Sequence, residues 1–258
     1  TVCRYSPSIV ISQDMLSYEK GEMSRFGFTL ARFRLIALKY IQAFSMKHAN
    51  GVIFLTNYAS KTIQQNIGRI DQFRIIPHGV DEIFRQKYVG GDWGLNSSED
   101  IQCIYVSNAA MYKHQWHLVN AISKLRIKGY RIKILLVGGG KGPAQKLLER
   151  TISELDPQRD FVEQTPFMKH DALPKILSTA DIFVFASSCE NMPVTLIEAM
   201  AGGIPIACSN RGPMPEVLND GGVYFDPENP TEIAEAIESI ISDNQLRISI
   251  AIKAKNLS

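Results

Sequence analysis

Three absences narrow what this 258-residue sequence can encode. No apolar run approaches the ~18–20 residues that a membrane-spanning helix requires, which excludes a transmembrane protein. No positively charged and then apolar leader stands at the start, so we expect no signal peptide. The four cysteines are far apart, form no Cys-x-x-Cys pair and have no histidine at ligand spacing. We therefore expect buried thiols in a reducing, cytoplasmic compartment and no metal site.

The composition is that of a globular protein. Hydrophobic residues make up 45% of the chain and charged residues 21%, with 18 glycines and 12 prolines. This balance is typical of neither disordered nor fibrous chains. At roughly 100–200 residues per domain, the length predicts one large domain or two small ones.

Charge is distributed unevenly along the chain. Residues 1–90 contain 12 Lys and Arg against 6 Asp and Glu, whereas residues 91–258 contain 16 against 20. The segment Ser24–His48 carries five basic residues and no acidic one, with apolar residues interleaved at helical spacing. This pattern predicts a basic amphipathic helix. Two interpretations stay open: an ordinary solvated face, or peripheral contact with an anionic membrane surface or a lipid-phosphate acceptor.

From Ile101 onward, short β-rich runs alternate with helical patterns. The expected strands are Ile101–Val106, Arg131–Val137, Asp160–Glu163, Asp181–Phe185, Ile204–Cys208 and Gly222–Phe225. The expected helices are His114–Lys128, Pro143–Leu155, Asp171–Thr179, Pro193–Ala201, Met214–Leu218 and Thr231–Ser242. Strands that alternate with crossover helices predict an α/β fold with a doubly wound parallel sheet.

The beginning of the chain shows a shorter version of the same pattern. Around the basic helix we expect strands at Ser8–Ile11, Gly51–Thr56 and Phe73–Pro77 and a helix at Ala59–Asn66. The segment Gly90–Glu99 is rich in turn-forming residues, which predicts a linker. We therefore predict a remnant of one domain at residues 1–90, a linker at 91–100 and a complete domain at 101–258, as in an N-terminally truncated protein.

In a parallel sheet of this kind, ligands bind beyond the carboxyl ends of the strands. Glu190 follows the expected strand Asp181–Phe185, and Glu198 lies inside the helix that begins near Pro193. Free N–H groups at a helix start are suited to a phosphate, and the two carboxylates can hold ligand hydroxyls on either side of it. The residues also allow a simpler interpretation, in which Glu190 only favours the helix dipole and Glu198 is a solvated surface residue.

The stretch from Glu190 to Ile206 resembles the E-x7-E region of GT-B glycosyltransferases of family 4, the glycosyl transferases group 1. The similarity extends upstream over 173–184 and downstream over 213–227, and Ile75–Asp81 is similar to the hinge between the family's two Rossmann-like domains. The resemblance implies a GT-B fold. Its doubly wound, Rossmann-like C-terminal domain would bind a nucleotide-sugar donor, and a partial N-terminal Rossmann-like domain would face the acceptor.

The resemblance also implies roles for particular residues. Glu190 would be catalytic and contact hydroxyls of the donor sugar, while Glu198 would contact the ribose hydroxyls. Amides near Val194 and Thr195 would bind the diphosphate, and Lys113 would neutralise it as it leaves. The remaining donor-binding candidates lie in loops that match the family's pattern: Asn108, Gly139, Phe167, Met168, Asn191 and Met192. Asn108 stands where the family usually has an arginine, so half of the expected cationic clamp is missing.

The implied function is transfer of a hexose from an NDP-sugar to a saccharide or lipid-linked acceptor, with retention of configuration, as in polysaccharide biosynthesis. The NDP-sugar would be the substrate, and we expect no cofactor, because the chain has no Asp-x-Asp to anchor a metal. A nicotinamide site is disfavoured because Pro143 interrupts the glycine pattern after Val137. No nucleic-acid partner is expected. The alternatives are a nucleotide-sugar-binding fragment without activity and an epimerase or phosphorylase of the same architecture.

Overall fold

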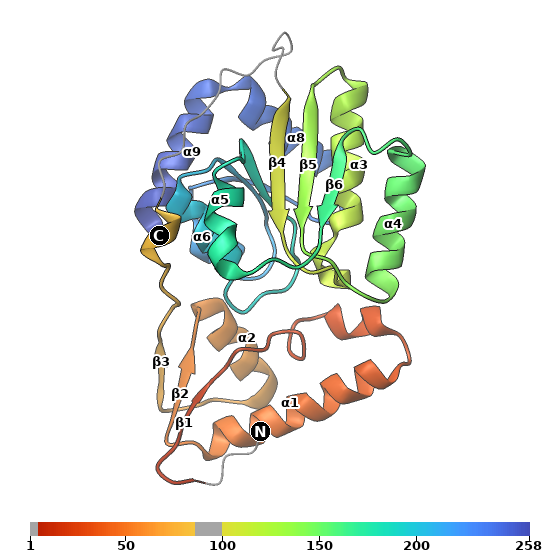
Figure 1. Cartoon of the computed structure of the whole chain (residues 1–258). Coiled ribbons are helices and arrows are strands. Elements are labelled where there is room, and N and C mark those ends of the chain that lie inside the picture. The colour runs from red at the N-terminus through yellow and green to blue at the C-terminus, as the bar shows by residue number, and fades with distance from the viewer. Residues whose placement is uncertain (1–4, 86–99) are drawn as a thin grey trace. The chain divides into compact units, whose positions relative to one another are not determined.

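The computed structural model describes residues 5–85 and 100–258, which form two compact units (Figure 1). Unit 1 comprises Thr1–Gly79 with the segments Cys189–Pro193 and Gly212–Val217. Unit 2 comprises Val80–Ser188, Val194–Arg211 and Leu218–Ser258. The predicted linker at 91–100 lies outside the described residues except for Asp100. The predicted domain limits, 1–90 and 101–258, stay predictions.

Unit 1 is built on a three-stranded parallel sheet in the order β1-β2-β3. Its strands are β1 (Ile9–Ile11), β2 (Gly51–Phe54) and β3 (Phe73–Ile75). Helix α1 (Leu30–His48) connects β1 to β2, and α2 (Asn57–Ile67) connects β2 to β3, as parallel strands require a crossover. The side chain of Thr56 caps α2 by accepting a 3.1 Å hydrogen bond from the amide of Ala59.

The prediction of one basic helix over Ser24–His48 is wrong at its start. A 3₁₀ helix, η1 (Glu22–Phe26), comes first, and Gly27 then has a φ of 55°. A right-handed helix cannot continue through a positive φ, so α1 begins only at Leu30. Arg25 lies in η1 and forms an ion pair with Glu22 at 2.9 Å.

The side chains of α1 are largely accessible. Only Ser45 and Met46 are buried in this helix, whereas Phe33, Tyr40 and Phe44 are all exposed. Phe33, Tyr40 and Phe44, three apolar residues of the predicted amphipathic pattern, therefore do not lie on a buried face.

Unit 2 contains a six-stranded parallel sheet in the order β6-β5-β4-β7-β8-β9. Figure 1 labels β4, β5 and β6, which lie side by side in this sheet. Its strands are β4 (Ile101–Val106), β5 (Ile132–Val137), β6 (Val162–Thr165), β7 (Ile182–Phe185), β8 (Ile206–Ser209) and β9 (Val223–Phe225). Its helices are α3 (Gln115–Ile127), α4 (Pro143–Leu155), α5 (Leu173–Leu177), α6 (Val194–Gly202), α8 (Pro230–Ser242) and α9 (Asn244–Leu257). The short helix α7 (Met214–Leu218) belongs to unit 1 except for its last residue. The sheet confirms the predicted doubly wound parallel fold.

The core of unit 2 lies on both faces of this sheet. Every residue of β7 and β8 is buried, as expected of strands covered by helices on both sides. Helix α3 packs against α4 and α8, and α9 packs against α6 and α8. The predictions did not include α9, which begins where the Asp243 side chain accepts a 2.9 Å hydrogen bond from the amide of Leu246.

One buried carboxylate joins α4 to β6. The oxygens of Asp156 accept hydrogen bonds from the amides of Asp160, Phe161 and Val162 at 2.8, 3.0 and 2.7 Å. Asp156 is only 2% exposed, so these hydrogen bonds are made away from solvent.

We expect Asp156→Ala to lower the free energy of unfolding by about 3 kcal/mol, because it leaves buried amides without acceptors. The matched control is Asp160→Ala, since that side chain is exposed nearby and its loss should change stability by less than about 0.5 kcal/mol. Urea denaturation followed by circular dichroism measures both. Equal effects of the two substitutions would show that the hydrogen bonds of Asp156 do not stabilise the fold.

Candidate functional site

The order of strands in unit 2 reverses direction between β4 and β7. From β4 the chain proceeds outward to β5 and β6, and from β7 it proceeds outward the other way to β8 and β9. The loops after β4 and β7 therefore diverge, and open α/β sheets bind ligands in the crevice at such a point. Most of the predicted site residues follow these strands.

Lys113 lies beside this reversal. It ends a 3₁₀ helix, η3 (Met111–Lys113), in the connection after β4, and it is 9% exposed. Its Nζ is 5.2 Å from the ring centroid of Tyr112 and 5.6 Å from that of Phe185, the last residue of β7. The ring faces favour a cation at this position.

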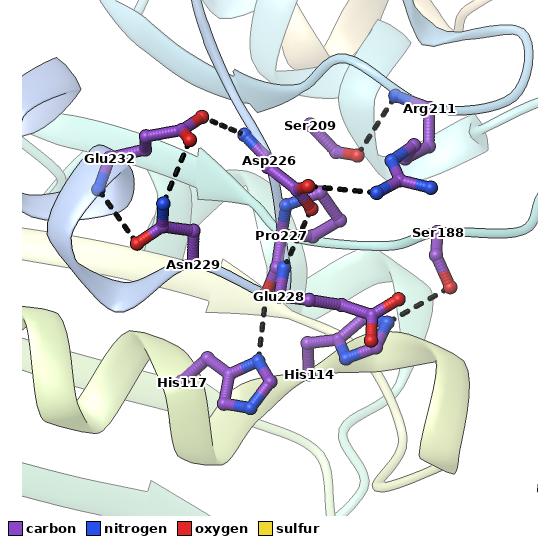
Figure 2. Close-up of polar contacts among 10 residues, drawn as sticks. All are labelled: His114, His117, Ser188, Ser209, Arg211, Asp226, Pro227, Glu228, Asn229 and Glu232. Carbon is purple, nitrogen blue, oxygen red and sulfur yellow. Dashed lines mark hydrogen bonds and ion pairs between the residues drawn. The ribbon is translucent and has the colours of Figure 1, made fainter.

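His114 connects the loop after β4 to the loop after β7 (Figure 2). It is fully buried, and its Nε2 lies 2.9 Å from Ser188 Oγ. Ser188 in turn donates its amide to Tyr112 O at 2.8 Å. The φ of His114 is 51°, a left-handed backbone that costs energy in a residue other than glycine and persists only where surrounding contacts impose it. The sequence pattern predicts His114 at a helix start but gives no sign of this contact, which spans 74 residues.

Glu198 is a buried carboxylate on α6. It is 3% exposed, and its Oε1 lies 2.6 Å from Nε2 of His170, in the 3₁₀ helix η4 (His170–Ala172). Its Oε2 is also buried and has no hydrogen-bond partner among the described residues. Burial raises the pKa of the Glu198 carboxyl, and the hydrogen bond from His170 opposes that shift. The interpretation of Glu198 as a solvated surface residue is therefore wrong.

The start of α6 lies at the end of β4. Thr195 Oγ1 donates to the carbonyl of Val106, the last residue of β4, at 3.3 Å. Val194, the first residue of the helix, is 43% exposed. The first N–H groups of a helix have no partner within it, so the amides of Val194 and Thr195 are placed where they could donate to a phosphate. Binding of a phosphate there stays a prediction.

The glycine loop after β5 contacts the loop after β4. Gly138 has a φ of 111°, and a Cβ there would lie 2.5 Å from Ser107 O. Gly139 differs, because a Cβ at this position meets nothing within 4 Å, and its carbonyl accepts from the amide of Ala109 at 3.3 Å. Asn108, next to these contacts, has an exposed side chain. A side chain at the predicted Gly139 would thus enter open space, whereas the backbone at position 138 requires a glycine.

Phe167 and Met168 follow β6, on the side of the sheet that supplies His170. Phe167 is 87% exposed, and the sulfur of the half-buried Met168 lies 4.0 Å from Thr165 Oγ1. Because His170 holds Glu198, this connection belongs to the same unit and the same region as the buried carboxylate. No sequence motif marks His170 as the partner of Glu198.

Three predicted residues belong to unit 1 instead. The Asn191 amide nitrogen donates to Ser12 O at 3.0 Å, and Met192 Sδ accepts from the amide of His78 at 3.1 Å. Glu190 is half-buried in the same segment. Lys113, Gly139, Thr195 and Glu198 therefore belong to unit 2, whereas Glu190, Asn191 and Met192 belong to unit 1.

Polar contacts also order the loops after β8 and β9 (Figure 2). Arg211 forms an ion pair with Asp226 at 2.8 Å, and His117 Nδ1 lies 3.0 Å from Pro227 O. Burial opposes the charged form of Asp226, but the hydrogen bonds from the amide of Glu228 and from Arg211 outweigh it and hold the pKa of that carboxyl below its usual range. The connection after β9 is thereby joined both to α3 and to the loop after β8.

The part of the chain that the structure describes contains neither a metal-binding cluster nor a membrane-spanning helix. In residues 5–85 and 100–258, no three His, Cys, Asp or Glu side chains are grouped so that they could hold a metal ion. Over the same ranges, no helix combines the length and the apolarity needed to cross a membrane.

The parallel sheet, with its strand order reversing between β4 and β7, is that of a Rossmann-like α/β domain. The chain belongs to the glycosyl transferases group 1 family, whose model matches residues 93–257. This confirms the family resemblance drawn from the Glu190–Ile206 stretch. Solved structures of GT-B glycosyltransferases share the fold: sucrose-phosphate synthase from Thermosynechococcus elongatus has a TM-score of 0.77 at 20% identity, covering 93% of this chain and 61% of that one.

Other comparisons agree. HepE of Anabaena, solved in complex with UDP-glucose, has a TM-score of 0.77 at 21% identity and covers 97% of this chain and 67% of its own. Alpha-D-kanosaminyltransferase of Streptomyces kanamyceticus is 24% identical over 85% of this chain and 58% of its own length. N-acetyl-alpha-D-glucosaminyl L-malate synthase of Bacillus anthracis is 27% identical over 64% of this chain and 42% of its own length. The chain thus spans about half the length of these two curated relatives.

The burial of Glu198 predicts an unusual effect of substitution. We expect Glu198→Gln to raise the free energy of unfolding at alkaline pH by about 1 kcal/mol, because a neutral amide is less costly to bury than a carboxylate. The raised pKa of Glu198 means that the wild type takes up a proton, and gains stability, as pH falls through that pKa. The advantage of the variant should therefore shrink in acid. Urea titrations at several pH values measure this, and a pH-independent difference would contradict it.

The two adjacent glycines should respond differently to substitution. Gly138→Ala places a Cβ against the carbonyl of Ser107 at a positive φ, so we expect a loss of about 2 kcal/mol or more in unfolding free energy. Gly139→Ala enters open space and should cost less than about 0.5 kcal/mol. Thermal melting of the two variants decides the matter, and similar melting temperatures would refute the distinction.

Proposed function

We propose that this chain supplies the donor side of a hexosyltransferase, which moves a hexose from an NDP-sugar to a saccharide or lipid-linked acceptor with retention of configuration. The observation that carries the proposal is Glu198, whose Oε1 is held by His170 and whose buried Oε2 has no partner among the described residues. Family membership and the likeness in fold to an enzyme solved with UDP-glucose support it.

The nucleotide would be held by groups of unit 2. A ribose hydroxyl donates to Glu198 Oε2 and satisfies an oxygen that is otherwise costly to bury. The amides of Val194 and Thr195 at the start of α6 and the ammonium of Lys113 then hold the diphosphate. Phe167 and Met168 contact the base, and the open space at Gly139 lets the nucleotide approach the backbone.

The chemical step is departure of the diphosphate from an oxocarbenium-like centre. Lys113 and the helix start are fixed in place before the reaction, so they stabilise the developing charge without reorganising. Glu190, with Asn191 and Met192 beside it, would contact the sugar. Asn108 adds no positive charge, so Lys113 carries this role without the arginine that is usual in the family. The NDP-sugar is the substrate, and we propose no metal or other cofactor.

Titrations with UDP and with uridine separate these roles. We expect Lys113→Ala to weaken UDP binding about tenfold or more, because a charge-assisted contact to phosphate is lost, and to leave uridine binding unchanged. Glu198→Gln should weaken both ligands, because both contain the ribose. Isothermal titration calorimetry measures the constants, with GDP and ADP as parallel ligands to identify the base.

The same proteins test the reaction. Glu190→Ala should bind UDP like the wild type but lose sugar release from the matching NDP-sugar. A pure binding fragment would release no sugar in any variant, and a phosphorylase would release sugar phosphate when inorganic phosphate is supplied. Unchanged affinity for both UDP and uridine in Glu198→Gln would contradict the proposed donor site itself.

A further inference from the structure

Unit 1 contains a cavity of about 760 Å³ whose lining is strongly basic. Lys20, Arg32, Lys39 and Lys61 line it, together with Tyr18 and Tyr58. Its volume lies within the ~300–1000 Å³ of ligand pockets, but such pockets are usually lined by apolar side chains. A cavity of this size with a polar, cationic wall suits a hydrophilic, anionic ligand.

The basic residues converge on the cavity from three parts of unit 1. Lys20 lies in the connection after β1, and Lys61 lies on α2. Arg32 and Lys39 are seven residues apart on α1, which places them on one face of the helix. Both are half-buried, so two cations of the basic segment face this cavity.

The positive charge of the cavity is not neutralised from within. None of these four cations has a carboxylate oxygen within 4 Å among residues 5–85 and 100–258. The one carboxylate in the lining is Glu19, whose oxygens accept the Tyr58 hydroxyl at 2.8 and 2.7 Å. Lys39 Nζ donates to the neutral Asn66 Oδ1 at 2.7 Å. An excess of positive charge therefore faces the space inside.

We propose that this cavity is a binding site for the phosphate group of a hydrophilic ligand. The planar guanidinium of Arg32 can donate two parallel hydrogen bonds to a phosphate, and the lysines add compact charges around it. The phosphate belongs either to a soluble molecule such as a sugar phosphate or to a lipid headgroup. The site lies in unit 1 and uses none of the donor-side residues, so the inference goes beyond the proposed function and does not depend on it.

Pyrophosphate is the probe for the first test, and the full chain is titrated by calorimetry. The cavity variant is Lys20→Ala with Lys61→Ala, since both side chains are exposed and neither is needed for packing. The control variant is Arg34→Ala with Lys47→Ala, which removes the same charge from exposed positions of α1 that do not line the cavity. Melting temperatures confirm that both variants are folded.

We expect pyrophosphate to bind the cavity variant about tenfold more weakly than the wild type and to bind the control variant like the wild type. The difference should diminish as salt screens the charges. Pyrophosphate can also enter the proposed donor site, so the titration can contain two binding events. Binding to the cavity is the event that is lost in the cavity variant and kept in the control variant. No difference between the two variants would overturn the proposal, while UDP binding tests the donor site separately.

Co-sedimentation with phosphatidylcholine vesicles that contain phosphatidylglycerol distinguishes the two sources of phosphate. If the ligand is a lipid headgroup, the wild type and the control variant sediment, the cavity variant does not, and pyrophosphate competes. If the ligand is soluble, pyrophosphate binds as expected and the vesicles do not. Vesicle binding that is lost only in the control variant, with pyrophosphate affinity unchanged in the cavity variant, would overturn the proposal and assign the charge of α1 to a membrane-facing surface.

Discussion

The reversal of strand order between β4 and β7 is the constraint on which the rest of unit 2 depends. Parallel strands must be joined by crossover connections of one hand, so reversing the direction of winding puts the helices that precede the reversal and those that follow it on opposite faces of the sheet. The loops at the reversal then have no helix between them. Lys113 lies in one of these loops, and the bond between His114 and Ser188 connects them.

Two buried carboxylates of unit 2 differ in how fully their oxygens are hydrogen-bonded. Asp156 is surrounded by three amides that donate to it, so its charge is fully compensated and it acts as a structural tie. Glu198 is just as inaccessible, yet only one of its oxygens has a partner among the described residues. Burial of this unpartnered oxygen therefore costs free energy that no contact among the described residues offsets. Such a cost is typical of a group whose remaining hydrogen bond is made to a ligand.

The sequence predicted the six strands of unit 2 to within about two residues, because apolar runs such as Ile182–Phe185 are unambiguous. The strand expected at Asp160–Glu163 begins later, at Val162. Local patterns could not have predicted the contacts of His114 with Ser188 or of His170 with Glu198. These contacts join residues 74 and 28 positions apart, which only the folded sheet brings together.

The adjacent glycines after β5 also constrain the evolution of this sequence differently. Gly138 lies against the backbone of Ser107, so almost any replacement there disturbs the contact between the loops after β4 and β5. Gly139 lies beside it without that restriction. Position 139 can therefore acquire a side chain by a single substitution and change the surface after β5, while the loop contact that Gly138 makes is inherited unchanged.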